Sequence, residues 1–215
     1  MDDVTKLKQL VGNDTLEIFG PSGSGKTTFA LYFAYVAAVN DYKVCYIDSE
    51  RNLNEDVEEL KKHNITYFYA PRLQDIVNYC ANLPKADLYV LDSIGFPVLA
   101  EYASASMREK GDMLLKCVAL TQYLKIATWK HDALAIVTNQ PVSEFGKNLT
   151  EDQLPPFGDK SKFGYKEIWR TYIVQQNSEK TECAVKAWRS RKFAKGKTLA
   201  KITITDQERK VELLV

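Results

Sequence analysis

The stretch Gly20-Pro21-Ser22-Gly23-Ser24-Gly25-Lys26-Thr27-Thr28 decides the fold, because it matches the pattern G-x-x-x-x-G-K-[ST] at every position. The apolar run Thr15–Phe19 before it predicts a strand, and residues 26–39 predict a helix that is apolar on nearly every face. Glycines in such a turn let backbone N–H groups point at phosphate oxygens, and the N-terminus of the following helix adds positive charge. The sequence therefore predicts a nucleotide-binding loop.

Two side chains of this loop, which has the Walker A pattern, are suited to bind a nucleotide together with its metal ion. The ammonium of Lys26 is expected to reach the β- and γ-phosphates of ATP. The hydroxyl of Thr27 is expected to bind Mg²⁺. A glycine-rich turn that fits the pattern by chance is the alternative. The strand before the loop and the helix after it favour the nucleotide site, because the motif requires that context.

Charge and composition exclude several classes of protein. The chain has 215 residues, with 29 Lys and Arg against 28 Asp and Glu, so its formal net charge is +1. A globally basic nucleic-acid-binding protein is therefore excluded, although a local basic surface is not. The hydrophobic share of 45% excludes a disordered chain, and the length fits a single α/β domain over residues 1–215.

Neither a membrane span nor a secretory leader is expected. The longest apolar run, residues 29–39, is shorter than the ~20 residues that a membrane-spanning helix needs. The acidic start of the chain is unlike a secretory leader, so we expect a cytoplasmic protein without membrane contact. The four cysteines are widely separated, which favours buried reduced thiols over zinc or a redox pair; disulfides stay an alternative for a heat-loving organism.

Strands and helices alternate through the first two thirds of the chain, which predicts a mostly parallel sheet. Further strands are expected at residues 43–48, 65–69, 88–92 and 134–138. Helices are expected at residues 55–63 and 105–130. Residues 141–165 contain three prolines and predict a long loop. Beyond it, four short strands should extend the same sheet with antiparallel pairing, at residues 170–175, 181–188, 199–205 and 210–214.

Three polar residues lie where predicted strands end, and parallel strands present such residues along one edge of a sheet. Asp92 suits a carboxylate near Mg²⁺, although a strand-terminal Asp is also common as a helix N-cap. Glu50 could orient a water molecule for attack on the γ-phosphate, or it could be a solvated acid. Gln140 could hydrogen-bond the γ-phosphate, or it could be an ordinary loop residue. Ser93 could share the water shell of the same metal ion.

Four blocks together resemble the RecA/RadA recombinase family in their order and approximate spacing: GPSGSGKTT (20–28), YIDSE (46–50), LYVLDSIG (88–95) and AIVTNQ (135–140). The resemblance implies a RecA-like P-loop NTPase core that uses ATP and Mg²⁺. It implies Glu50 as the catalytic glutamate, Asp92 as the Walker B aspartate and Gln140 as the γ-phosphate sensor. It also places a first DNA-binding loop near residues 95–112 and a second near residues 141–165.

Two features depart from the family pattern. Only about 14 residues precede the first strand, so we expect the N-terminal DNA-binding domain and the linker of RadA-type recombinases to be absent. In the expected first loop, Arg108 and Lys110 are offset by acids, unlike the arginine-rich loop of a strand-exchange enzyme. The chain thus resembles a minimal, core-only RadA paralogue of the kind found in archaea. The resemblance implies single-stranded DNA, a RadA-type recombinase or another paralogue as partners, a nucleoid-associated location, and a homo-oligomer as an open alternative.

A locally basic stretch near the C-terminus has three interpretations. It contains no acid and interleaves two aromatic residues with cations, which are Lys186, Arg189, Arg191, Lys192, Lys195, Lys197 and Lys201. Cations that track phosphates and aromatics that stack on bases are typical of single-stranded DNA binding. Solvated lysines that protect a sheet edge explain the pattern equally well. In RecA-like assemblies, Arg189 or Arg191 could instead reach the γ-phosphate of a neighbouring subunit.

The expected function is slow ATP hydrolysis that is coupled to single-stranded DNA binding and assists or modulates a recombinase in recombination and repair. The turnover could depend on DNA or on an adjacent subunit. An ATP-gated adaptor without enzymatic activity and a RecA-like signalling ATPase that does not bind DNA are the alternatives. A small-molecule kinase is disfavoured, because such kinases usually carry an arginine-bearing lid and the sequence offers no convincing one.

Overall fold

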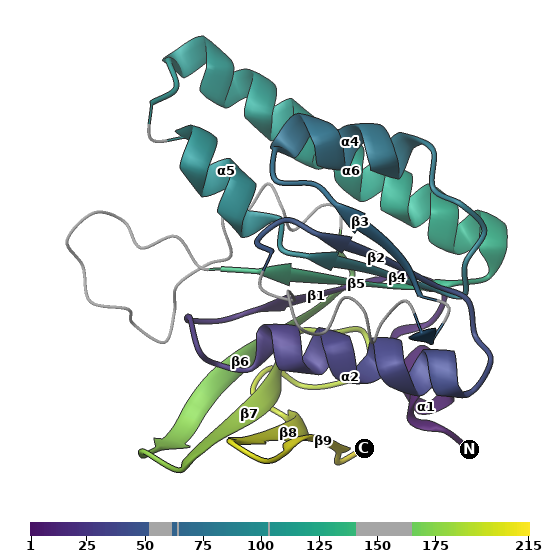
Figure 1. Ribbon diagram of the computed structural model, residues 1–215, viewed down its shortest axis with the longest axis vertical. Helices are drawn as coiled ribbons and strands as arrows, with labels where there is room; N and C mark the ends of the chain where they lie inside the picture. Colours follow the sequence, from purple (N-terminus) through teal and green to yellow (C-terminus); the bar gives the residue numbers. More distant parts are fainter. Residues whose placement is uncertain (52–61, 64, 103, 141–164) are drawn as a thin grey trace.

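A nine-stranded sheet forms the centre of the molecule (Figure 1). The computed structural model describes residues 1–51, 62–63, 65–102, 104–140 and 165–215. The strand order is β3-β2-β4-β5-β1-β6-β7-β8-β9, with parallel pairing from β3 to β6 and antiparallel pairing from β6 to β9. The strands are β1 (Thr15–Phe19), β2 (Val44–Asp48), β3 (Thr66–Tyr69), β4 (Leu88–Asp92), β5 (Leu134–Asn139), β6 (Glu167–Gln176), β7 (Lys180–Arg189), β8 (Thr198–Thr205) and β9 (Arg209–Leu213).

Helices cover both faces of the sheet. Of the helices that the structure describes, α1 (Asp3–Val11) and α2 (Lys26–Val39) lie on one face (Figure 1). The other described helices, α4 (Leu73–Ala81), α5 (Gly95–Tyr102) and α6 (Met107–His131), lie on the opposite face. Crossover helices on both faces are what a parallel sheet requires, because its strands are buried on both sides. The predicted α/β class, with antiparallel strands at the C-terminus, is therefore confirmed.

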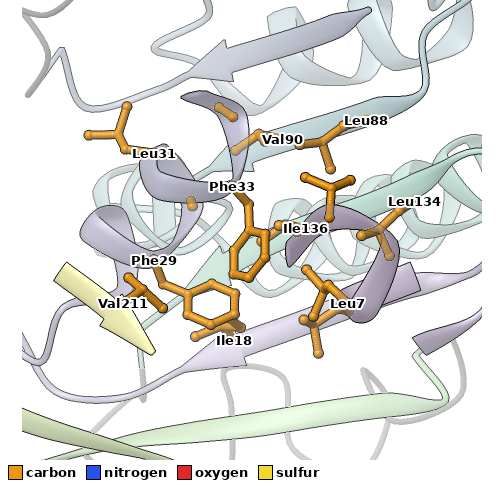
Figure 2. Packing of buried hydrophobic residues seen from close by; sticks show 14 of the residues in the cluster. Leu7, Ile18, Phe29, Leu31, Phe33, Leu88, Val90, Leu134, Ile136 and Val211 are labelled. Carbon is orange, nitrogen blue, oxygen red and sulfur yellow. The ribbon is translucent and has the colours of Figure 1, made fainter. Parts of the chain in front are cut away.

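Two apolar cores, one on each face, hold the layers together. Figure 2 shows Phe29 and Phe33 of α2 pointing toward Ile18 and Ile136 of the sheet. Strands β1, β2, β4 and β5 are buried along their whole length, as inner parallel strands usually are. A polar side chain on one of these strands therefore needs a specific reason to be there.

The strands and the long helices lie close to the predicted ranges. The main differences are helices that the sequence does not predict. β1 and α2 have the predicted bounds, and α6 covers the predicted 105–130 within two residues. Helices α1, α4 and α5 were not expected. Most of residues 95–112, expected as a loop, is helical, because α5 starts at Gly95 and α6 follows from Met107. The helix expected near 55–63 and the loop expected at 141–165 lie almost entirely outside the described residues.

Two expectations about composition can be compared with the described residues. No helix among them is long and apolar enough to span a bilayer. All four cysteines are buried and free, as predicted, and are Cys45, Cys80, Cys117 and Cys183.

Candidate nucleotide-binding site

The glycine-rich loop, residues 20–28, connects the carboxyl end of β1 to the N-terminus of α2. Gly25 caps the helix with φ 83°, a left-handed conformation that favours glycine. Gly20 lies against β6, where an added Cβ would be 2.0 Å from Thr171 Oγ1 and 2.7 Å from the Thr171 carbonyl oxygen. Ser24 Oγ and Thr171 Oγ1 are 2.5 Å apart. The loop is therefore held tightly on β6, and its first glycine is required by lack of space.

A cavity of about 200 Å³ lies beside this loop. The carboxyl ends of β1, β2, β4 and β5 meet at one edge of the sheet, because these strands are parallel. Side chains that follow these strands therefore converge on the first turn of α2. The cavity is lined by Ser22, Gly23, Gly25, Lys26, Thr27, Thr28, Glu50, Asp92, Ser93, Gln140 and Ile204.

Lys26 lies inside this cavity rather than in solvent. Lys26 is 8% exposed, and its Nζ donates a hydrogen bond to the Pro21 carbonyl oxygen at 2.8 Å. Burial lowers the pKa of Lys26, and the nearby carboxylates of Asp92 and Glu50 act in the opposite direction. The ammonium is thus held beside the loop by a carbonyl that a phosphate oxygen could replace.

Asp92 ends β4 and is almost fully buried. Its carboxylate accepts hydrogen bonds from Tyr46 OH at 3.0 Å, from Thr27 Oγ1 at 3.3 Å and from Thr138 Oγ1. Burial raises the pKa of Asp92, and these hydroxyl donors partly offset the effect. The Thr27 hydroxyl and the Asp92 carboxylate are neighbouring oxygen ligands of the kind that Mg²⁺ prefers, so the residues present fit this ion.

Glu50 is positioned by a connection between the ends of β2 and β4. Ser93 Oγ donates to Glu50 Oε1 at 2.5 Å. Ser49 Oγ donates to the Ser93 carbonyl oxygen at 2.7 Å and accepts from Ser93 N at 3.0 Å. Asp48 Oδ1 accepts from Glu50 N at 2.9 Å, which fixes the turn after β2. Ser93 thus holds Glu50, a role that the sequence does not predict, and its place in the water shell of the metal ion stays a prediction. The sequence also predicts no role for Ser49 or Asp48.

Gln140 follows β5 and also lines the cavity. Its backbone N–H donates to Asn139 Oδ1 at 3.0 Å. Gly95, at the start of α5, lies so close that an added Cβ would be 2.9 Å from Asn139 Oδ1 and 3.1 Å from Gln140 N. The chain at Gln140 is therefore confined by α5 as well as by its own strand.

No family model and no curated protein matches the sequence. Among solved structures, the crystal structure of the RadB recombinase matches with a TM-score of 0.65. The match covers 97% of this chain and 96% of that chain, at 19% sequence identity. The chain has a RecA-like fold. The resemblance that the four sequence blocks indicate is therefore confirmed in the architecture.

The RecA-like fold separates the cavity from the basic C-terminal stretch. Arg189 ends β7 and pairs with Ile168, near the start of β6, whereas the cavity lies at the carboxyl ends of the parallel strands. The turn after Arg189 therefore lies at the opposite end of the strands, near the amino ends of β1 and β6. Lys192 Nζ in this turn donates to the Gln9 carbonyl oxygen of α1.

Arg191 is also tied to the N-terminal part of the chain. Its Nη2 donates to the Val11 carbonyl oxygen at 3.2 Å and lies 3.5 Å from Asp14 Oδ2. Its backbone N–H donates to Glu167 Oε1 at 2.9 Å. Lys195 differs in its partner, because its Nζ lies 4.0 Å from the centre of the Trp188 ring.

Arg108 and Lys110 lie in the first turns of α6, not in a loop. Arg108 is exposed, and Lys110 Nζ lies 4.4 Å from the centre of the Tyr102 ring. The structure thus brings Lys26, Thr27, Glu50, Asp92 and Gln140 into one cavity and leaves the expected DNA-contacting cations outside it.

Proposed function

We propose that this chain is a single RecA-like ATPase domain that binds ATP with Mg²⁺ at the cavity and hydrolyses it slowly. One observation carries the proposal: side chains from α2 and from the ends of β2, β4 and β5 line the same cavity. The set includes an ammonium, a hydroxyl beside a carboxylate, a second carboxylate and an amide, which are the groups that phosphoryl transfer uses.

Each group has a role in this proposal. The N–H groups of the glycine-rich loop and Lys26 bind the β- and γ-phosphates. Thr27 and Asp92 hold Mg²⁺, which neutralises charge on the phosphate oxygens when it is bound. Glu50 accepts a hydrogen bond from the attacking water and orients it in line with the bond to be broken. Gln140 donates its side-chain amide to the γ-phosphate.

We further propose that the chain binds single-stranded DNA and acts with a RadA-type recombinase or a paralogue. The fold shared with the RadB recombinase supports a role in recombination. Exposed Lys195 over Trp188 and exposed Arg108 provide cations for DNA phosphates, with an aromatic ring beside one of them. The turn after Arg189, residues 190–197, is called the basic turn. Because it is far from the cavity of its own chain, any contact with a γ-phosphate requires a second subunit.

The test is the ATPase rate of the purified chain with and without single-stranded DNA, over a range of protein concentrations. We expect slow turnover that DNA stimulates, and a specific rate that rises with concentration if a neighbouring subunit completes the site. Lys26→Ala should abolish nucleotide binding, because it removes the phosphate-binding ammonium. Tight ATP binding by this variant would contradict the site. Binding of ATP without turnover in every condition would favour the ATP-gated adaptor.

A further inference from the structure

Glu17 is a buried acid in the middle of β1, the strand that leads into the glycine-rich loop. It pairs with Val137 on one side and with Ile168 on the other, and its exposed fraction is 0%. Burial raises its pKa to about 7. In the described part of the chain, its Oε2 has no hydrogen-bond partner. A carboxyl group in such a place is costly unless it makes a specific interaction.

The hydrogen bond that Glu17 makes connects it to the cavity beside the glycine-rich loop. Glu17 Oε1 accepts a hydrogen bond from Asn139 Nδ2 at 2.8 Å, and Asn139 Oδ1 accepts from Gln140 N at 3.0 Å. The two contacts use opposite ends of the Asn139 amide. If that amide turned over, its NH₂ group would face the N–H of Gln140, and its oxygen would face an acceptor of Glu17. Glu17 therefore selects the orientation of Asn139 that anchors Gln140.

The surroundings leave this connection little freedom. Asn139 is 2% exposed, and the close approach of Gly95 confines its amide oxygen. Glu17 lies three positions before Gly20, so the same strand carries the Gln140 anchor and the start of the glycine-rich loop.

We propose that Glu17 is a positioning residue that, through Asn139, holds Gln140 in place to distinguish a nucleoside triphosphate from a diphosphate. The inference rests on the proposed function, in which Gln140 contacts the γ-phosphate. Glu17 itself does not touch the nucleotide. It connects the strand that bears the phosphate-binding loop to the residue that detects the terminal phosphate.

Two substitutions of similar size separate this role from packing alone. Glu17→Gln keeps an oxygen that can accept from Asn139, whereas Glu17→Met removes the acceptor and keeps the length of the side chain. Both remove the charge. A difference between them therefore reports the hydrogen bond to Asn139.

The measurement is the affinity for ADP and for the non-hydrolysable ATP analogue AMP-PNP, by calorimetry in the presence of Mg²⁺. Glu17→Met should lower the preference for AMP-PNP over ADP about tenfold, as expected for the loss of one hydrogen bond. Gln140→Ala, the positive control, should lower it at least as much. Glu17→Gln should stay within about twofold of the wild-type preference. ADP affinity should be unchanged in Glu17→Met, because the loop itself is not altered.

The outcomes separate this inference from the proposed function. If the wild-type chain binds neither nucleotide, the nucleotide site itself is wrong. If Glu17→Met binds ADP normally and keeps the wild-type preference for AMP-PNP, Glu17 has no positioning role although the site stands. Should Glu17→Met fail to fold, Asn139→Ala breaks the same connection from its other end. That variant should show the same loss, and an unchanged preference would overturn the inference.

Discussion

Glu17 should make the stability of this protein depend on pH in a direction opposite to that of most carboxylates. Its pKa is raised from 4.5 to about 7 by burial, and Asn139 offsets only part of that effect. Below pH 4.5 both the folded and the unfolded chain hold the proton, so the group contributes no penalty. Between pH 4.5 and about 7 the unfolded chain ionises first, and the folded state loses stability as the pH rises.

The size of the effect follows from this shift. Each pKa unit corresponds to ~1.4 kcal/mol, so a shift from 4.5 to about 7 gives a loss of about 3 kcal/mol by pH 8. The assay is urea unfolding of the wild-type chain and of Glu17→Gln between pH 4.5 and pH 8. Their difference in unfolding free energy cancels the titration of every other group. We expect the variant to gain about 3 kcal/mol on the wild type across this range.

Glu17→Met serves as the matched control for this measurement. It also lacks a titratable group at position 17, so its difference from the wild type should change with pH by the same amount. The two variants should differ only by a constant, because Met cannot accept the hydrogen bond from Asn139. A difference that stays flat from pH 4.5 to pH 8 would refute the reasoning, since it would mean that Glu17 has the same pKa in both states.

Three other substitutions test the cavity and the basic turn. Glu50→Gln should keep ATP affinity within about twofold and lower kcat by about 100-fold or more, because a neutral amide is a far weaker base than the carboxylate; an unchanged kcat would mean that another group orients the water. Gly20→Ala should lower stability by about 1–3 kcal/mol in urea, because its Cβ would overlap Thr171; an unchanged midpoint would contradict the tight contact between the loop and β6. Lys195→Ala should reduce the salt dependence of single-stranded DNA binding by about one unit of slope, with no change in urea stability. A constant slope would exclude Lys195 from the DNA contact.

The parts of the fold that the sequence predicts are those encoded by local patterns. The glycine-rich loop and its two flanking elements are contiguous, so composition and spacing were sufficient to predict β1 and α2 with their bounds. The convergence of Glu50, Asp92 and Gln140 was predictable because carboxyl ends of parallel strands share an edge. α6 also has a local signal, the capping box formed by Ser106 and Glu109, which marks its first residue.

The missed elements depend on distant contacts or on weak local signals. Arg72 provides no side-chain cap for α4, and Leu73 N instead donates to Glu101 Oε1 at 3.0 Å, 28 positions away. α5 was not predicted because the family resemblance implies a loop at these residues. Pro97 is nevertheless acceptable there, since it lies in the first turn of the helix. The contact between Leu73 and Glu101 lies outside any window of neighbouring residues.

The basic C-terminal turn shows how tertiary partners change the meaning of a charge pattern. From the sequence, Arg191 is one cation among several, and DNA binding or a contact with a neighbouring subunit explains it. In the structure it lies against Asp14 and Glu167, which are 6% and 0% exposed. Releasing the Arg191 side chain to a phosphate would take a cation away from these two buried carboxylates, although Asp14 would keep the N–H of Thr15 and Glu167 would keep the backbone N–H of Arg191.

This loss distinguishes Arg191 from Lys195, whereas the charge pattern of the sequence does not. Lys195 is exposed, and its contact is with an aromatic ring, so a phosphate can approach without uncovering a buried acid. Arg191 instead joins α1 to the start of β1 and β6, which stabilises the end of these strands that lies opposite the cavity. We therefore expect Arg191→Ala to lower stability and to affect DNA binding only through that loss. If Arg191→Ala kept its urea midpoint and flattened the salt dependence of DNA binding, the structural role assigned to Arg191 would be wrong.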